Sequence, residues 1–422
     1  MNSSIPRRKF LATGAAALGL APFTILRAQS SSPSDEIHLG VIGCGGQGVG
    51  NMTNFLNIKG VRVVAVCDVD SKAMAAAKAK VDGHYNTSDC KTYAHYTDLL
   101  AHPGLNVVSL ATPDHSHARI GIDSANAGLD IYGEKPFAWG LAEGRQLAEA
   151  VAKNKRVWQT GSWQRSGGEF RRFRALIQNN TIGKLTRFEC GTPSGMSIKQ
   201  NYPAEQMAAM VGKPPAELDW PGWCGPVKNA EYHPELHPWN WRWHHTFGGG
   251  QLLDWVGHHV DIALWTLGLD GTGPVKVEGT GEKDGHPFFN TYTKYAYQGT
   301  FADGRVIEVR SDFGGTKFTG ENGWIHVNRG QLEASDREML RNLPADFVTK
   351  PPSHYQNFID CVRSRELTVA PAEGAHRAAS FGQLALVALD TKQPLTWDPK
   401  AEKVIGNEAQ ASHPRLGARL SV

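Results

Sequence analysis

Apolar runs alternate with helix-like stretches along residues 36–161 of this 422-residue chain. Short, strongly apolar segments predict buried strands at 37–43, 61–68, 106–112, 129–136 and 156–161. The stretches between them predict helices after the first glycine-rich loop and at 71–81, 115–127 and 140–152. This alternation is typical of a parallel sheet with right-handed crossovers, so we expect an α/β fold.

A glycine-rich loop follows the first predicted strand. Gly43, Gly45 and Gly48 form the pattern GxGxxG, which permits a tight turn, a close approach of backbone to a pyrophosphate, and close helix–strand packing. The N-terminus of the following helix favours phosphate charge. Asp68 ends the second predicted strand, 20 residues after Gly48, where an acid can bind a ribose hydroxyl. The pattern predicts a dinucleotide site, and the lack of an arginine beside Asp68 favours NAD over NADP.

Ligands of parallel sheets bind beyond the carboxyl ends of the strands. Here those ends fall at 43–48, Asp68, 112–114, 134–136 and 161–165, and we expect the chemistry of the protein there. The predicted cofactor-binding residues are Gly43, Gly45, Gly46, Gln47, Gly48, Asp68, Thr112, Pro113, His117, Glu134, Lys135 and Gln164.

The first 28 residues have the architecture of a signal peptide. Arg7, Arg8 and Lys9 precede an uncharged run over 10–26, and we expect cleavage near Ala28. The stretch PRRKFL fits the twin-arginine type and predicts export to the periplasm or beyond by the twin-arginine translocation machinery; a short membrane anchor is the alternative. Removing this segment removes four basic and no acidic residues, so the formal charge changes from +3 to −1. No basic patch then remains to indicate nucleic-acid binding.

The cysteines and histidines do not indicate a metal site. The six cysteines form no CxxC pair, so we expect neither zinc nor a dense disulfide framework, but free and mostly buried thiols. Four histidines lie close together in the second half of the chain, but their spacing matches no established zinc signature. They are His233, His237, His244 and His245.

Four motifs in this order resemble the glucose–fructose oxidoreductase/inositol dehydrogenase (Gfo/Idh/MocA) family: the glycine loop, ATPDHSH, GEKP and GGGQLLDWVGHHVD. The resemblance covers nearly all of the chain after the leader, and the sequence from 354 onward looks like the secreted bacterial branch. It implies a Rossmann NAD-binding domain, which we place at 36–161. It also implies an α/β domain at 162–422 with a large, mostly antiparallel open sheet, whose free face makes contacts in a homo-oligomer, a dimer or tetramer.

The resemblance implies three catalytic residues, Lys135, Asp254 and His258. The lysine of the EKP motif lies beside the nicotinamide and the substrate in the family, and a lysine desolvated near a cationic ring can lose its proton. Asp254 and His258 match the family pattern DxxxH, and their spacing predicts one side of a helix, where a merely solvated polar face is the alternative. His258 is a candidate base that Asp254 would orient. The sequence does not decide whether Lys135 or His258 takes the proton.

Aromatic residues are concentrated between 218 and 245. Trp239, Trp241 and Trp243 alternate, so in an extended segment all three would face one way and stack on the C–H faces of a sugar. A contact between domains or subunits is the alternative. The predicted substrate-binding residues are Trp163, Arg165, Trp241, Arg242 and His245.

These features predict an NAD(P)-dependent oxidoreductase that moves a hydride between a CH–OH group of a sugar or sugar derivative and a tightly bound nicotinamide. Export would separate the protein from the pool that recycles the cofactor, so we expect a redox-neutral cycle. Two alternatives stay open: an NAD-dependent glycosidase that acts through a transient keto-sugar, and a non-catalytic sensor of dinucleotide and sugar. The sugar itself is not determined by the sequence.

Overall fold

The computed structural model describes residues 36–199, 201–350 and 352–419. The predicted signal peptide at 1–28 therefore lies outside the described residues. Within them, no helix is both long enough and apolar enough to cross a bilayer. All six cysteines are free and buried, as expected.

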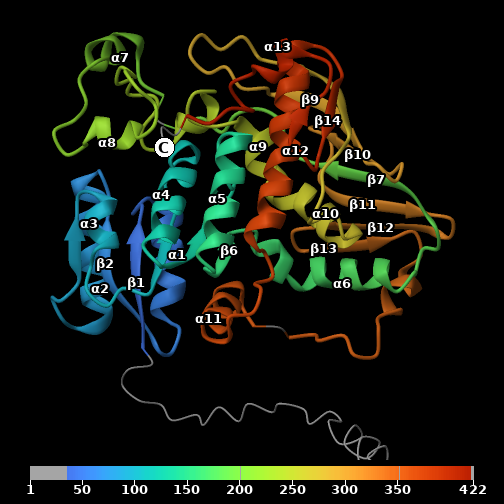
Figure 1. Ribbon diagram of the computed structural model, residues 1–422, viewed down its shortest axis with the longest axis horizontal. Coiled ribbons are helices and arrows are strands. Elements are labelled where there is room, and N and C mark those ends of the chain that lie inside the picture. The colour runs from blue at the N-terminus through green and yellow to red at the C-terminus, as the bar shows by residue number, and fades with distance from the viewer. Residues whose placement is uncertain (1–35, 200, 351, 420–422) are drawn as a thin grey trace, which may run out of the picture. The chain divides into compact units, whose positions relative to one another are not determined.

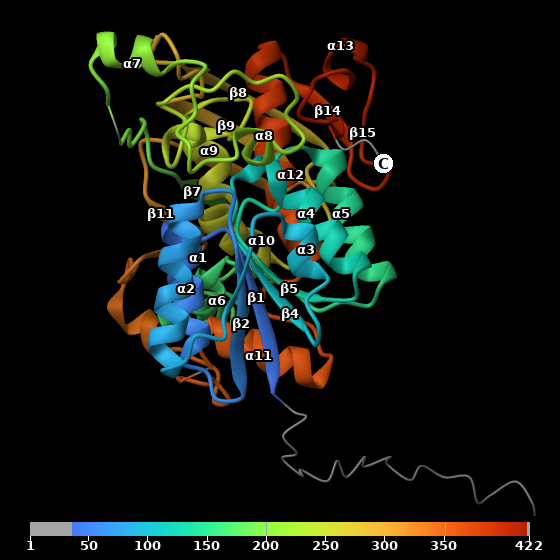
Figure 2. The ribbon, with the colours of Figure 1, turned by 90° about the vertical axis from the view of Figure 1, so that its left-hand side faces the viewer.

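The first half of the described chain forms a six-stranded parallel sheet in the order β3-β2-β1-β4-β5-β6. Helices cover both of its faces (Figure 2), which is why its central strands are buried on both sides. The strands are β1 (Ile37–Ile42), β2 (Val61–Cys67), β3 (Lys91–Tyr93), β4 (Val107–Leu110), β5 (Asp130–Gly133) and β6 (Trp158–Thr160). The helices are α1 (Gly46–Leu56), α2 (Ser71–Tyr85), α3 (Tyr96–Leu100), α4 (Asp114–Asn126) and α5 (Leu141–Lys153).

Local signals explain where these elements begin and end. The side chain of Asp70 accepts hydrogen bonds from the amides of Lys72 and Ala73 and so caps α2, which ends at the left-handed Asn86. The predicted strands and helices are confirmed, whereas β3 and α3 were not predicted. Both are short, and β3 is largely exposed, so neither carries an apolar period.

The second half builds a mostly antiparallel sheet of nine strands within the described residues, in the order β13-β12-β11-β7-β10-β9-β8-β14-β15. Only β7 and β10 pair in parallel. This arrangement confirms the expected fold class (Figure 1). The strands are β7 (Leu185–Gly191), β8 (Lys276–Glu282), β9 (Lys294–Thr300), β10 (Val306–Arg310), β11 (Gly315–Gly320), β12 (Gly323–Asn328), β13 (Gln331–Ala334), β14 (Leu395–Asp398) and β15 (Lys403–Val404).

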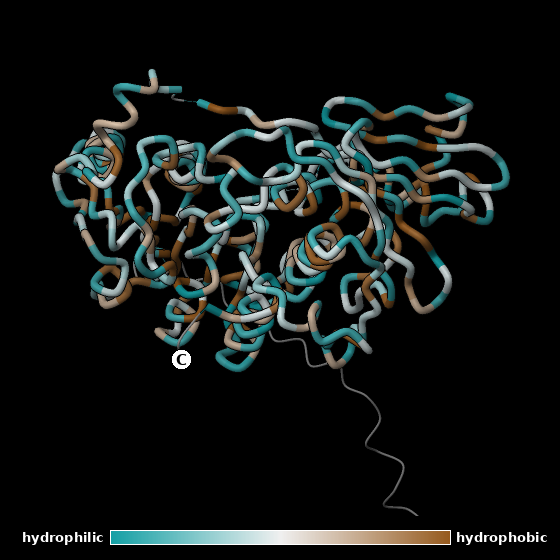
Figure 3. The backbone as a smooth tube through the Cα atoms, turned by 90° about the horizontal axis from the view of Figure 1, so that it is seen from above, coloured by the Kyte–Doolittle hydropathy of each residue, from teal (hydrophilic) through white to brown (hydrophobic). Residues whose placement is uncertain are grey.

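Helices pack on one face of the large sheet and bury its main apolar core. Apolar segments lie mainly inside the molecule and polar ones toward its outside (Figure 3). The packed elements are α6 (Gly168–Gln178), α9 (Gly250–Trp255), a π-helical turn η4 (Val256–Val260), α10 (Asp261–Leu267) and α12 (Ala372–Thr391). The remaining helices and 3₁₀ turns are η2 (Trp163–Ser166), α7 (Ala204–Met210), α8 (Trp220–Cys224), η3 (Asn240–Trp243), η5 (Arg337–Arg341), α11 (His354–Ser364) and α13 (Glu408–Ala411).

Helix α11 returns from the second half of the chain to the first sheet. The ring of Phe358 packs against Phe55 and Tyr132, with ring centroids 6.1 and 5.7 Å apart. The hydroxyl of Tyr355 donates to Asn51 Oδ1 at 2.9 Å. A late segment therefore completes the apolar core beside β1 and β2.

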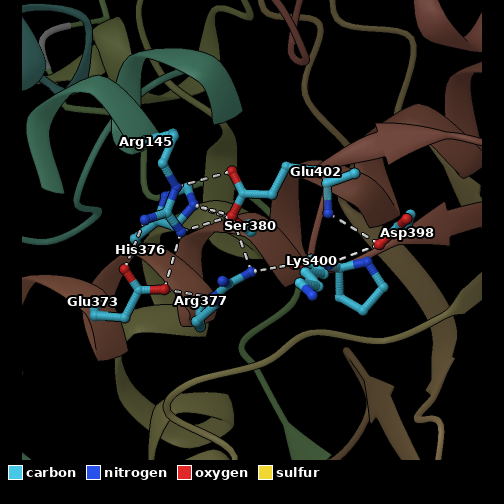
Figure 4. A network of polar contacts seen from close by, with 10 residues as sticks. Arg145, Glu373, His376, Arg377, Ser380, Asp398, Lys400 and Glu402 are labelled. Carbon is cyan, nitrogen blue, oxygen red and sulfur yellow. Dashed lines mark hydrogen bonds and ion pairs between the residues drawn. The ribbon is translucent and has the colours of Figure 1, made fainter. Parts of the chain in front are cut away.

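A network of charged side chains joins α5 to α12 (Figure 4). The guanidinium of Arg145 donates to Glu373 at 2.8 Å and to Glu402 at 2.7 Å. His376 and Arg377 also contact Glu402, each at 2.9 Å. This network fixes the last helix of the first half against the long helix of the second.

Candidate functional site

A cavity of about 990 Å³ lies along the carboxyl ends of the first sheet. Its volume is at the upper end of the range of small-molecule sites. The predicted site residues that line it are Gly43, Gly45, Gly46, Gln47, Asp68, Thr112, Pro113, Glu134, Lys135, Trp241, Arg242 and Asp254.

The glycine loop has the geometry that a dinucleotide requires. Gly43 has a φ of +92°, and a Cβ atom there would lie 2.6 Å from the carbonyl oxygen of Ala111. A Cβ on Gly48 would lie 1.8 Å from the carbonyl oxygen of Gly43, so this residue packs inside and does not line the cavity. Gly45 has no neighbouring atom within 4 Å of such a position, and no side chain caps α1. The first-turn amides of α1 therefore suit a pyrophosphate, and the loop fits NAD.

Two carboxylates flank this loop. Asp68 accepts hydrogen bonds from the amides of Cys44, at 2.5 Å, and Asp70, at 2.8 Å, and burial raises its pKa. Glu134 accepts from the side-chain amides of Gln47 and Asn51 at 3.1 and 3.0 Å. Asp68 thus lies where a carboxylate would bind a ribose hydroxyl. Glu134 positions the Gln47 side chain at the cavity wall through their hydrogen bond.

Lys135 forms an ion pair across the cavity wall. Its Nζ lies 2.7 Å from Oδ1 of Asp254, although the two residues are 119 positions apart in sequence. Burial alone would raise the pKa of Asp254, but the charges of Lys135 and Arg242 keep it below its usual value. Asp254 therefore contacts Lys135, whereas the sequence predicted that it orients His258.

The chain through Asp254 and His258 is helical, as expected, but the helix is not regular. Asp254 lies in α9, whereas His258 lies in the π-helical turn η4. The imidazole is buried between the rings of Trp163 and Trp255, and it is not part of the cavity wall. Its Nδ1 has no hydrogen-bond partner among the described residues. Burial, with the nearby charge of Lys135, lowers its pKa well below the usual value, so the ring is neutral.

Arg165 is not available to a substrate. It is 1% exposed, and its five N–H groups donate to Asp261, Asp270 and the carbonyl oxygen of Val369 at 2.6–3.1 Å. The predicted contact of Arg165 with substrate is therefore corrected: this guanidinium is a buried structural group.

Four other predicted site residues also lie away from the cavity wall. His117 lies between the carbonyl oxygens of Pro136 and Thr112, 2.7 and 2.8 Å from its ring nitrogens, and so ties two cavity loops together. Gln164 is fully buried, with its side-chain amide group 3.2 Å from the carbonyl oxygen of His258. The main chain of His245 accepts a hydrogen bond from Trp139, while Trp163 is 39% exposed beside Arg329.

The tryptophans at 239, 241 and 243 all line the cavity. Trp241 and Trp243 lie in the 3₁₀ turn η3 and Trp239 directly precedes it, so the three rings reach the cavity without an extended segment. The guanidinium of Arg242 lies 4.0 Å from the ring centre of Trp239 and 4.4 Å from that of Trp241. This geometry holds a cation between two aromatic rings in the cavity wall.

Residues 217–239, which we call the clasp, connect the second half to the end of β2. The amide of Ser71 donates to the carbonyl oxygen of Glu217, and the amide of Asp219 donates to that of Val69, both at 2.9 Å. From there the clasp runs along the cavity, and its Trp223 lines the wall while its carbonyl oxygen contacts His115 at 2.8 Å. The clasp therefore covers the cavity beside Asp68.

The predicted site set lacks five charged residues of the wall: Asp70, Asp114, Arg119, Lys228 and Arg419. Asp114 begins α4 and is 5% exposed, and its position at a strand end was the one signal that could have identified it. Arg419 lies 3.4 Å from the ring centre of Trp139, and its Nε donates to Glu143 at 3.1 Å. Over the described ranges, no group of three or more His, Cys, Asp or Glu side chains is arranged to hold a metal ion.

Two family profiles match the chain. Residues 37–162 match the profile described as "Oxidoreductase family, NAD-binding Rossmann fold". Residues 166–415 match "Oxidoreductase family, C-terminal alpha/beta domain". The chain belongs to the Gfo/Idh/MocA oxidoreductase family.

Gfo/Idh/MocA relatives differ in their named activities. The inositol 2-dehydrogenase of Salmonella typhimurium is 30% identical over 147 residues, which are 34% of this chain and 42% of that enzyme. A glycosyl hydrolase family 109 protein of Shewanella amazonensis is 30% identical over 125 residues, 29% of this chain and 27% of that protein. The chain thus matches less than half the length of these relatives.

A solved structure shares the fold over most of this chain. Scyllo-inositol dehydrogenase from Lactobacillus casei, with bound NAD(H) and scyllo-inositol, has a TM-score of 0.59 at 16% identity. The match covers 86% of this chain and 99% of that one.

Proposed function

We propose that this protein oxidises and re-reduces a CH–OH group of a sugar or sugar derivative, with an NAD that stays bound through the cycle. The clasp carries this proposal. It is anchored by main-chain hydrogen bonds beside Asp68 and covers the cavity that the glycine loop opens. A cofactor under such a cover leaves slowly, because release requires those bonds to open.

The residues of the cavity fit separate parts of the proposed cofactor and substrate. The amides of Gly45, Gly46 and Gln47 would hold the pyrophosphate, and Asp68 a ribose hydroxyl. When bound, NAD supplies the acceptor and donor of a hydride. Lys135, held by Asp254, donates a hydrogen bond to the oxygen of the reacting carbinol and fixes its orientation.

The first test is the nucleotide content of the native protein. We expect about one NAD(H) per chain after purification without added nucleotide, released on denaturation. Trp223→Ala, which removes part of the wall, should lose the nucleotide faster during dialysis than Trp324→Ala, a matched change on β12. An empty protein that binds NAD weakly would contradict the bound-cofactor cycle.

Export and assembly belong to the same proposal. A twin-arginine leader would place a folded, NAD-loaded enzyme in the periplasm, where a redox-neutral cycle needs no recycling pool. Cell fractionation tests the location, and light scattering of the purified protein tests whether it forms a dimer or tetramer.

The similarity to the glycosyl hydrolase family 109 protein favours a second candidate, an NAD-dependent glycosidase. Release of nitrophenol from α- and β-nitrophenyl glycosides would favour it. A third candidate is a sugar sensor without turnover. It would gain support if Lys135→Ala abolished sugar-dependent reduction of the bound NAD and left the biological role intact.

A further inference from the structure

Arg242 differs from the other arginines of the cavity wall in having no carboxylate partner. Arg119 pairs with Asp123 at 2.8 Å. Arg419 pairs with Glu143 at 3.1 Å. Arg242 donates one hydrogen bond, to a main-chain carbonyl oxygen at 3.1 Å, and no other described residue accepts from its remaining N–H groups. A guanidinium has five N–H donors, so most of this one is open to a ligand. We propose that Arg242 binds the carboxylate of an acidic sugar, a substrate class that rests on the proposed function.

The aromatic neighbours of Arg242 favour a carboxylate over other ligand groups. The guanidinium lies between the rings of Trp239 and Trp241, with ring centres 4.0 and 4.4 Å away, and all three residues line the cavity. Rings stacked on a guanidinium leave its N–H groups, which point outward in its plane, as the groups that contact a ligand. A carboxylate fits this edge, because its two oxygens accept two parallel hydrogen bonds. A sugar hydroxyl offers a single oxygen and no charge.

The surrounding main chain holds this turn in place. A Cβ atom on Gly248 would lie 2.7 Å from the carbonyl oxygen of Arg242, so η3 packs closely against the residues that precede α9. The buried guanidinium of Arg415 donates to the carbonyl oxygens of His245, at 2.8 Å, and Gly248. A binding group that is fixed before the ligand arrives loses less conformational entropy on binding. The stacked guanidinium is therefore suited to orient a substrate.

The acidic group would lie near the reacting carbinol. Lys135 and Asp254 pair at 2.7 Å on the same cavity wall, and the charge of Arg242 acts on Asp254 together with that of Lys135. Asp254 is thus already engaged by Lys135. Asp114 shares the wall but forms no hydrogen bond with Arg242, and burial raises its pKa to about 7, so it is not a full counter-charge at neutral pH. Arg242 therefore keeps positive charge for a substrate.

Binding to the NAD-loaded wild-type protein tests this class without any substitution. Isothermal titration calorimetry compares D-glucuronate with D-glucose, and D-galacturonate with D-galactose. At least one acid should bind about 10–100-fold more tightly than its neutral partner, the contribution of hydrogen bonds to a charged group. The advantage should shrink as salt is added, because salt screens the charge. If neither acid binds more tightly than its neutral partner, the proposal is overturned.

Variants test whether Arg242 carries the preference. Arg242→Gln should bring the ratio of the two affinities close to one, whereas Arg242→Lys, which keeps the charge but loses the planar edge, should keep part of it. Arg174→Gln is the matched control, because the guanidinium of Arg174 lies 4.5 Å from the ring centre of Trp265 and is not part of the cavity wall. It should keep the full ratio. A full ratio in Arg242→Gln, or loss of NAD from both Arg242 variants, would overturn the proposal, since the second result would assign Arg242 to the cofactor.

Reduction of the bound NAD separates this proposal from the proposed function. The absorbance of NADH after each sugar is added reports oxidation of that sugar. If an acid binds through Arg242 and no probe reduces the NAD, the proposed function fails for these sugars while the acid site stands. If neutral sugars reduce the NAD and bind as tightly as the acids, the proposed function holds and the acid site is overturned.

Discussion

Replacing Arg165 by methionine separates a structural role from a substrate-binding role. Methionine fills a similar volume without charge, so Asp261, whose side chain is 2% exposed, would stay buried with no counter-charge. Breaking a buried ion pair costs about 3–5 kcal/mol. Asp270 is 32% exposed and can be hydrated once the guanidinium is gone, so we expect the lower end, about 3 kcal/mol of unfolding free energy.

The assay is urea unfolding followed by tryptophan fluorescence, with wild type and variants saturated with NAD. Arg174→Met is the matched control, because the guanidinium of Arg174 lies over Trp265 and forms no ion pair with any described residue; we expect a loss below about 1 kcal/mol. Adding Asp261→Asn to Arg165→Met should recover part of the stability, because it removes the buried charge. Unchanged stability together with a raised KM for the reacting sugar would refute this reasoning and restore the substrate role of Arg165.

Three further predictions concern the cofactor loop, the acid side of stability and the choice of nucleotide. Gly48→Ala should lower the unfolding free energy by about 1–3 kcal/mol and abolish NAD binding, because its Cβ would clash with the carbonyl oxygen of Gly43. Gly50→Ala, at an exposed helix position with open space, should raise the unfolding free energy by about 1 kcal/mol. Thermal melts and nucleotide assays check both variants. Hydrogen bonds from His376 and Arg145 outweigh the effect of burial and hold the pKa of Glu402 at about 2, against 4.5 for an ordinary glutamate, so stability should fall as the pH drops from 4.5 toward 2. Urea titrations at several pH values should show a smaller fall in Glu402→Gln. Asp68→Asn should raise the ratio of NADP to NAD retained from an equal mixture, because its carboxylate repels a 2′-phosphate; an unchanged ratio would mean that Asp68 does not read the ribose.

The first sheet was predictable because its signals are local. The glycine loop, the apolar runs and the acid after the second strand lie within a short stretch of sequence. Each of these signals depends on the local conformation of the chain and on residues close to it in sequence. Residues placed by that sheet, such as Asp68 and Lys135, were therefore found in the cavity as expected.

The rest of the site depends on contacts between distant parts of the chain. Arg165 has its partners 96 and 105 positions away, and nothing near it in sequence indicates that its donors are all used. The pairing of Lys135 with Asp254 spans 119 positions. The π-helical turn at His258 is invisible to a helical spacing rule, which assumes a constant turn. Sequence reasoning thus identified residues near the site better than it assigned their partners.

The return of α11 to the first sheet has a consequence for how the protein is made. The surface around Phe55 and Tyr132 is covered only when Phe358 has been synthesised. At about 5–20 residues per second, the ribosome needs on the order of tens of seconds to elongate from the end of β5 to α11. Throughout that interval the nascent chain exposes the apolar surface around Phe55 and Tyr132, to which a chaperone can bind. The nucleotide fold, although encoded first, is finished only near the end of translation, and a tightly held cofactor would be loaded then.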